Sequence, residues 1–323
     1  MSALARFAPF LYMNGSVAAF STMDALVKGI TGVYPTWQIV AIRFLVSFVL
    51  LGPPVLFTLR HIPRGPVLAG NALRGLCTMI SAAAFFQALN YVALPFATSV
   101  FFTGPLMTAG LARLMIGEKA GGKLVGAIIA GFLGVLIIMS GELFGNASGL
   151  LEAEAAIGMA LALLSAFAYA VSVVLIRVHA GEESALVSGF QQILVASIVA
   201  TPLAASGWTP PAGGDIWWLL TIGVLGTIGT VSVYAAFSRA PAARLAPMEY
   251  LSFGWACLWS FLLYDELPSL TTIAGGVVIV AAALVATRDA GGGDGGAPDL
   301  LLPEDELDAD PAMPLGASSA REA

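Results

Sequence analysis

Four charged side chains lie inside long apolar stretches of this 323-residue chain: Asp24, Arg43, Arg74 and Glu249. A charge at the centre of a bilayer costs about 3 kcal/mol or more, so such residues are expected to serve function. A guanidinium can hold a carboxylate of a bound molecule through two hydrogen bonds. A carboxylate can hold an ammonium group or exchange a proton. The four residues are therefore the first candidates for a binding site.

Helix geometry places these four residues at two depths. At about 1.5 Å per residue, Asp24 and Arg43 reach the same level near one membrane surface and could form an ion pair. Lys28, one turn beyond Asp24, is a competing partner. Arg74 and Glu249 share a level in the opposite half and could also meet. Bracing of helices is an equal alternative to ligand binding for both pairs.

Polar residues also recur at helical spacing in four of the stretches. The four sets are Asn14, Ser21, Asp24 and Lys28; Asn71, Arg74, Thr78 and Ser81, with Phe85 on the same face; Ser165, Tyr169 and Ser172; and Thr227, Thr230 and Tyr234. A polar face in lipid must turn towards protein or water. One such face is ordinary between packed helices. Four of them favour the walls of a central cavity.

Aromatic side chains at mid-stretch are more often packing residues than ligand contacts. Apolar walls with a few polar anchors would nevertheless suit an aromatic amino acid. The candidate substrate-binding residues are Asn14, Phe20, Asp24, Arg43, Arg74, Thr78, Phe101, Tyr169, Tyr234 and Glu249.

Motifs of known catalytic chemistry are absent from the sequence. The two histidines, His61 and His179, form no H-E-x-x-H pattern, and there is no G-x-S-x-G or Walker sequence. Cys77 and Cys257 are read as packing residues. We therefore expect no catalytic residue, no metal site and no cofactor.

Ten apolar stretches must position the candidate residues, and each is long enough to cross a bilayer as a helix. They cover 7–29, 36–58, 66–92, 95–116, 121–141, 154–178, 184–205, 214–238, 243–264 and 268–287. Ten of the fourteen Lys and Arg residues fall at the N-terminus, in alternating gaps or at the stretch ends beside those gaps, whereas the five opposite gaps and the stretch ends beside them hold Lys28 and six acids. Because Lys and Arg stay on the cytoplasmic side, both termini are expected there.

Composition agrees with a membrane protein. The chain is 58% hydrophobic and 11% charged, with a mean hydropathy of +0.89. Residues 289–323 contain nine acidic residues and one arginine, together with a glycine run and four prolines. This segment is expected to be a disordered, acidic cytoplasmic tail.

The chain also contains an internal repeat. Pro95-Phe96-Ala97-Thr98 opens one stretch, and Pro241-Ala242-Ala243-Arg244 opens another about 146 residues later. The repeating unit is five spans, which predicts units at 1–146 and 147–288. Because five is odd, the second unit must be inverted relative to the first. Inverted repeats around a central cavity are typical of secondary transporters.

Three segments resemble the EamA-type repeats of the drug/metabolite transporter superfamily: Ala19–Arg43, Leu94–Met139 and Ala240–Thr287, the last with the sequence Ala246-Pro247-Met248-Glu249-Tyr250. The resemblance covers about residues 7–288. The pattern is most similar to bacterial amino-acid and metabolite exporters. It implies a ten-helix efflux carrier for neutral or aromatic amino acids.

The sequence therefore predicts an all-α integral membrane carrier in the bacterial inner membrane, working by alternating access. Its expected partners are a small metabolite and the lipid bilayer, with no nucleic acid. A small-residue ridge (Gly122, Gly126, Ala130, Gly134) would permit close helix contact within the chain or across a homodimer. Proton coupling and facilitated diffusion both stay open. The alternatives are a membrane-embedded enzyme acting on lipids or lipid-linked groups and a receptor or scaffold.

Overall fold

The computed structural model describes residues 3–58, 66–116, 122–145, 149–178, 185–237 and 248–290. These segments are helical, and no strand is assigned within them. The helices are α1 (Ala3–Ile30), α2 (Thr36–Thr58), α3 (Pro66–Ala88), α4 (Leu94–Phe101), α5 (Gly104–Ile116), α6 (Gly122–Gly145), α7 (Gly149–Val178), α8 (Ala185–Ala205), α9 (Asp215–Phe237), α11 (Leu251–Tyr264) and α12 (Leu270–Ala290). The predicted all-α fold class is confirmed.

Most helices coincide with the predicted stretches, but the stretch 95–116 is not one helix. α4 ends at Phe101 and α5 begins at Gly104. Pro105 explains the interruption, because proline lacks an N–H and its ring clashes with the carbonyl four residues earlier. The predicted stretch 243–264 begins outside the described residues. Nearly all of the predicted tail also lies outside them.

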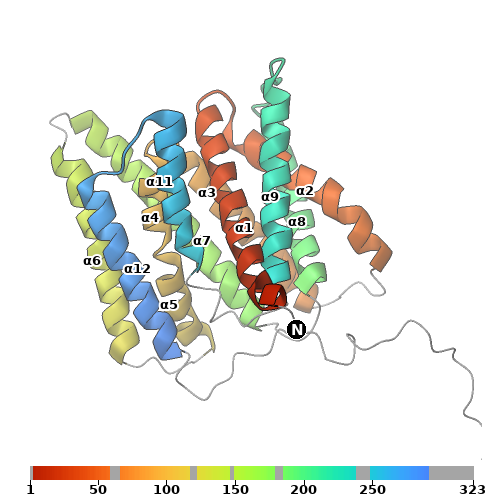
Figure 1. Ribbon diagram of the computed structural model, residues 1–323. Helices are drawn as coiled ribbons and strands as arrows, with labels where there is room; N and C mark the ends of the chain where they lie inside the picture. Colours follow the sequence, from red (N-terminus) through yellow and green to blue (C-terminus); the bar gives the residue numbers. More distant parts are fainter. Residues whose placement is uncertain are drawn as a thin grey trace, which may run out of the picture.

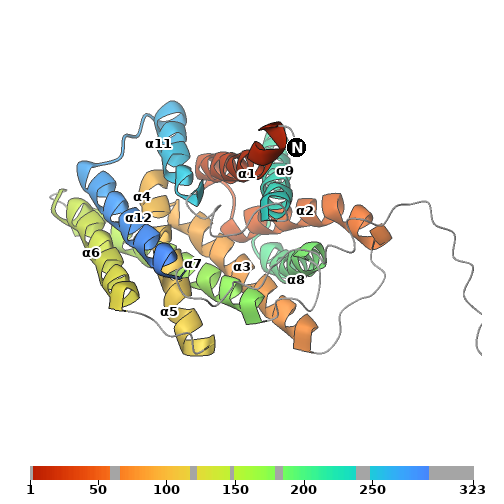
Figure 2. The ribbon, with the colours of Figure 1, turned by 60° about the horizontal axis from the view of Figure 1, so that its bottom comes forward.

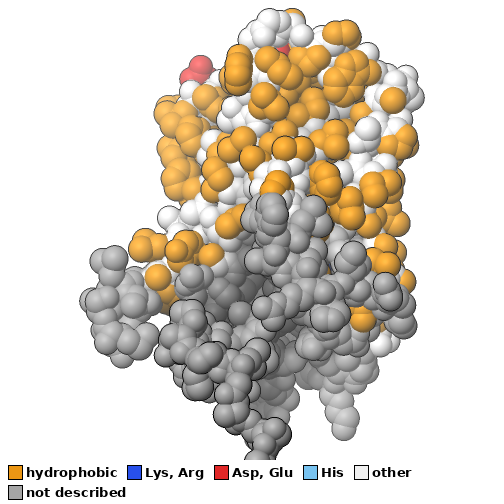
Figure 3. Space-filling view, turned by 90° about the vertical axis from the view of Figure 1, so that its right-hand side faces the viewer, with side chains coloured by type: hydrophobic (Ala, Val, Ile, Leu, Met, Phe, Trp, Pro, Cys, Tyr) orange, Lys and Arg blue, Asp and Glu red, His pale blue; other side chains and the backbone are white. Residues whose placement is uncertain are grey.

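Six stretches of the described helices are long and apolar enough to cross a bilayer. They are Thr36–Pro53, Val67–Ala88, Leu94–Ala112, Ala153–Leu175, Val187–Ala205 and Asp215–Val233. The face formed by α2 and α9 agrees with this: apolar side chains cover most of its described surface (Figure 3). Val49, Trp217 and Ile228 are among its exposed residues. The chain is thus a multi-pass membrane protein, and the number of ten spans stays a prediction.

The helices pack in pairs that join the two predicted units. α1 packs mainly on α9, α3 on α7, α2 on α8, and α6 on α12. Figures 1 and 2 both show α6 beside α12 at one edge of the molecule, with α2, α8 and α9 at the other. Exchanging the two units turns the α1–α9 pair into the α7–α3 pair and leaves α2–α8 and α6–α12 unchanged. A two-fold relation between the units produces such a pattern, and the inverted orientation stays a prediction.

Glycines allow α6 and α12 to approach closely. A Cβ atom at Gly134 would lie 2.9 Å from the carbonyl oxygen of Gly275, which is too close for a side chain. Gly126, on the same predicted ridge, has open space at its Cβ position. The ridge is therefore used within the chain at Gly134, and its use in a homodimer stays a prediction.

The predicted topology leads to a labelling experiment. Gly213 lies in the exposed connection between α8 and α9, and its Cβ position is open, so Gly213→Cys should not disturb the fold. In a variant whose native cysteines are replaced, we expect this cysteine to react with an impermeant maleimide added to intact cells. A tag on either terminus should react only after permeabilisation. Reaction of Gly213→Cys solely in permeabilised cells would reverse the topology.

Candidate functional site

Polar side chains within the helices fall into two groups, according to whether the structure gives them hydrogen-bond partners. The polar face of α3 belongs to the first group. Asn71 Nδ2 donates to Gln191 Oε1 at 2.7 Å, and the hydroxyls of Ser81 and Ser165 lie 3.1 Å apart. These bonds join α3 to α8 and α7, so this face forms interhelical contacts.

Arg74 lies at the centre of this α3 network. Its guanidinium donates to Asn71 Oδ1 at 3.2 Å, to Gln192 Oε1 at 3.1 Å and to Ser188 Oγ. Gln192 Nε2 in turn donates to Thr78 Oγ1 at 2.6 Å. Arg74 is buried, and these three partners are uncharged. The guanidinium therefore holds α3 and α8 together through charge-assisted hydrogen bonds.

Arg74 and Glu249 do not meet, although both were expected at one depth. No ion pair within 4.0 Å joins these two residues, and the structure describes both. The reason is the helix arrangement: α3 packs on α7 and α8, whereas Glu249 lies two residues before α11, which packs on α1 and α4.

Asp24 and Arg43 belong to the second group. Both side chains are half-buried, and neither forms a hydrogen bond with a described residue. The two charges interact electrostatically, but the expected ion pair is not formed within 4.0 Å. The Arg43 guanidinium instead lies over two rings, 5.0 Å from the centre of Phe44 and 5.5 Å from that of Phe86. Such cation–π contacts stabilise the charge while leaving its N–H donors available.

Two glycines of α9 give the side chains around this site their space. A Cβ atom at Gly226 would lie 3.2 Å from both Arg43 Nε and Met23 Sδ. At Gly229 it would lie 2.8 Å from the ring of Phe20. α9 can therefore approach α1 and α2 while Phe20 and Arg43 occupy the space between the helices.

A second carboxylate lies beside an aromatic cluster. Glu249 interacts electrostatically with the phenols of Tyr169 and Tyr250. The ring centre of Tyr169 is 5.3 Å from that of Phe101, which is 5.7 Å from that of Phe85. The Glu249 carboxylate forms no hydrogen bond with any residue in the described segments. The cluster thus combines one anionic group with apolar ring faces.

The remaining predicted residues are divided between these settings. Asn14 is half-buried in α1 without a hydrogen bond to a described residue. Thr78 belongs to the α3 network, and its hydroxyl is also 3.1 Å from that of Ser172. Tyr234 lies in α9, but its side chain is outside the described part of the structure.

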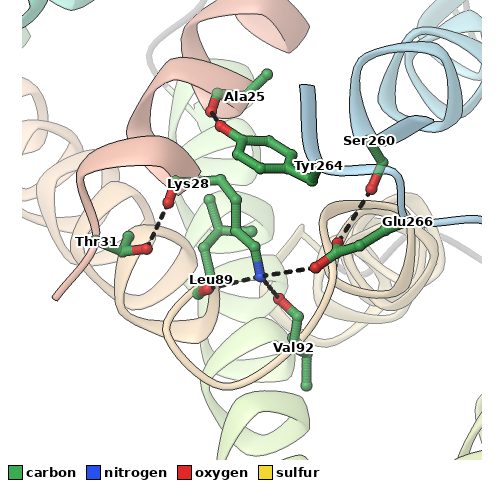
Figure 4. A network of polar contacts seen from close by, with 8 residues as sticks. All are labelled: Ala25, Lys28, Thr31, Leu89, Val92, Ser260, Tyr264 and Glu266. Atoms are coloured by element: carbon green, nitrogen blue, oxygen red, sulfur yellow. Dashed lines mark hydrogen bonds and ion pairs between the residues drawn. The ribbon is translucent and has the colours of Figure 1, made fainter. Parts of the chain in front are cut away.

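Lys28 and Glu266 form a contact that the sequence did not predict. The Nζ atom of Lys28 lies 4.0 Å from Glu266 Oε1 (Figure 4). This is the ion pair that the structure shows among its described residues. One signal was available: both residues occur in gaps predicted to lie on the same side of the membrane.

Asp24 and Arg43 can bind a small polar molecule by charge and hydrogen bonds, and Arg43 lies against two aromatic rings. Glu249, beside Tyr169 and Tyr250, is a separate anionic group. Within the described segments, no group of three or more His, Cys, Asp and Glu residues is placed to hold a metal ion.

Comparisons with known proteins match almost the whole described chain. The sequence profile of the EamA-like transporter family matches residues 8–140 and 156–288. A pseudopaline exporter of Pseudomonas aeruginosa is 28% identical over 271 residues, covering 80% of this chain and 88% of its own. An S-adenosylmethionine uptake transporter of Rickettsia felis is 23% identical over 262 residues, covering 81% and 86%. One crystal structure shares the fold, with a TM-score of 0.58, 19% identity, and coverage of 90% and 99%.

Proposed function

Since the chain belongs to the EamA-like transporter family, we propose that it is a secondary carrier for a small zwitterionic metabolite. An amino acid or a related compound is the proposed substrate, and the bacterial inner membrane is the proposed location. The names of the relatives support the transporter class, and they include both an exporter and uptake transporters. Because these relatives differ in the direction of transport, export is part of the proposal.

The observation that carries this proposal is the relation between Asp24 and Arg43. Their opposite charges lie on α1 and α2, interact electrostatically, and form neither a hydrogen bond nor an ion pair within 4.0 Å. A ligand with a carboxylate and an ammonium group would supply both missing partners. The Arg43 guanidinium would hold the carboxylate bidentately, and Asp24 would accept hydrogen bonds from the ammonium.

The surrounding rings support an apolar substituent on this ligand. Phe44 and Phe86 lie against Arg43, and Phe20 of α1 lies beside Gly229 of α9, three residues from the Gly226 that faces Arg43. Sites for small molecules usually combine apolar walls with a few polar anchors. A neutral amino acid with an aliphatic or aromatic side chain has this chemistry, whereas a dianion or a sugar phosphate does not.

Glu249 and Asp24 are the carboxylates available for energy coupling. A proton-coupled cycle needs one of them to take up a proton in one access state and release it in the other. A facilitated cycle needs neither to titrate. The two cycles differ in a measurable way, because only the first concentrates substrate when a pH gradient is imposed.

The proposal is tested with full-length protein reconstituted into liposomes. We expect labelled phenylalanine or leucine to equilibrate across the membrane faster than in protein-free liposomes. Phenethylamine and 3-phenylpropionate, which each lack one charge, should compete at least about tenfold more weakly, because they leave a buried charged group without its partner. Imposing a pH gradient in a parallel series distinguishes the two energy sources.

Equal competition by the zwitterion and by either singly charged analogue would overturn the zwitterionic substrate class. If the protein transports neither amino acid and binds none of the analogues, the proposed substrate is overturned altogether.

A further inference from the structure

Lys28 connects three separate segments at the predicted outer end of the bundle. Its Nζ donates to the carbonyl oxygens of Leu89 at 3.2 Å and Val92 at 3.0 Å, both in the connection between α3 and α4. Glu266, in the connection between α11 and α12, lies 4.0 Å away (Figure 4). One side chain of α1 thus contacts both neighbouring connections.

The two carbonyl bonds form the stronger part of this contact. Lys28 is 17% exposed, whereas Glu266 is 40% exposed, and exposed ion pairs contribute little. Carbonyls at the C-terminal end of a helix lack intrahelical donors and carry partial negative charge. Leu89 directly follows α3, so the ammonium group is a suitable cap for that helix end.

The position of Lys28 matters because α1 has few other contacts with α3 and α4. α1 packs chiefly on α9 and α11, and α3 packs on α7 and α8. A further bond reinforces the same end: the Tyr264 hydroxyl of α11 donates to the carbonyl oxygen of Ala25. Asp24 lies one helical turn inward from Lys28, directly beneath these contacts.

We propose that Lys28, the carbonyls of Leu89 and Val92, and Glu266 form an outer latch that closes the candidate site on the outer side of the membrane. The latch must open for substrate to pass between the site and that side. This inference rests on the proposed carrier function, because only a carrier needs its site to change access.

Glu266 has a second hydrogen-bonding position available when the latch opens. Beside it lies a cavity of about 100 Å³ whose lining includes the hydroxyl-bearing residues Ser260, Ser269 and Thr272. Ser260 Oγ already donates to Glu266 Oε2 at 3.2 Å. The carboxylate can therefore leave Lys28 and remain hydrogen-bonded, as a two-state contact requires.

The latch is tested by the accessibility of a cysteine beneath it, which does not depend on transport. Ser21 is buried in α1, one turn further inward than Asp24, and serine to cysteine is nearly isosteric. In full-length Ser21→Cys protein lacking Cys77 and Cys257, we measure the rate of reaction with an impermeant maleimide added outside intact cells.

Three latch variants are compared with this parent. Glu266→Gln keeps both carbonyl bonds of Lys28, so we expect labelling to accelerate about two- to fivefold. Lys28→Met removes every latch contact, and labelling should accelerate about tenfold or more. Asp265→Asn is the matched control: Asp265 is exposed, and asparagine tolerates its left-handed backbone (φ 53°), so the rate should not change.

Equal rates in the parent, Glu266→Gln and Lys28→Met would overturn the latch. Acceleration by Asp265→Asn to the same extent would also overturn it, because a general loosening of the connection would then explain the result. If accessibility follows the expected order but no zwitterion is transported, the latch stands and the proposed substrate falls. Zwitterion transport with unchanged accessibility gives the opposite conclusion.

Discussion

Replacing Arg43 with methionine is expected to lower the initial rate of zwitterion transport at least about thirtyfold while the protein remains folded in the membrane. Truncating one member of a buried, hydrogen-bonded charge pair costs about 2–5 kcal/mol, and about 1.4 kcal/mol is tenfold. Arg43 forms no hydrogen bond with a described residue, so its removal should affect thermal stability much less than transport. Flux into proteoliposomes and thermal unfolding in detergent measure the two effects separately.

Two companion variants sharpen this prediction. Arg43→Lys keeps the charge but cannot hold a carboxylate bidentately, so we expect an intermediate rate. Asp24→Asn should impair transport as Arg43→Met does. If the two charges only balance each other, the double variant Arg43→Met with Asp24→Asn would recover transport. Such recovery would contradict a direct role in binding, whereas inactivity of all three charge-neutralised proteins would support it.

Helix positions were largely predictable from the sequence because apolar length and turn residues act locally. The stretch 36–58 became α2, Thr36–Thr58, without change. The break between α4 and α5 also had a local signal, since Pro105 follows a glycine in the middle of an apolar run. The prediction failed there because hydropathy alone does not register the lost N–H of proline.

Partners of the charged residues were not predictable in the same way. Depth along a helix follows from residue number, but a contact also requires the two helices to be neighbours and to face each other. Arg74 and Glu249 were predicted to lie at one depth, but their helices are not neighbours: α3 packs on α7 and α8, and α11 packs on α1 and α4. The prediction that polar faces line a cavity was likewise incomplete, since Ser81 and Asn71 bond to neighbouring helices.

Arg74→Ala is expected to destabilise the protein strongly. The substitution removes three hydrogen bonds from a charged donor and leaves Asn71, Ser188 and Gln192 with fewer partners in a buried setting. Hydrogen bonds to charged groups contribute about 1.5–3 kcal/mol each, so we expect a loss of about 3 kcal/mol or more. The unfolding midpoint in detergent should fall by about 6 °C or more.

Graded controls separate this role from substrate binding. Ser172→Ala removes one neutral hydrogen bond, to Thr78, and should cost about 1 kcal/mol. Arg74→Lys should fall between the alanine variant and the parent, because lysine keeps the charge but offers fewer donors in a fixed geometry.

The comparison between Arg43 and Arg74 then distinguishes two kinds of intramembrane arginine. Both terminal nitrogens of Arg74 donate to protein acceptors, so its loss should lower the unfolding midpoint and reduce transport only through the amount of folded protein. Arg43 has its donors available, so its loss should reduce transport per folded molecule. An Arg74→Ala protein with the parent's unfolding midpoint and no transport would instead place Arg74 at the substrate, as its charge in an apolar stretch first indicated.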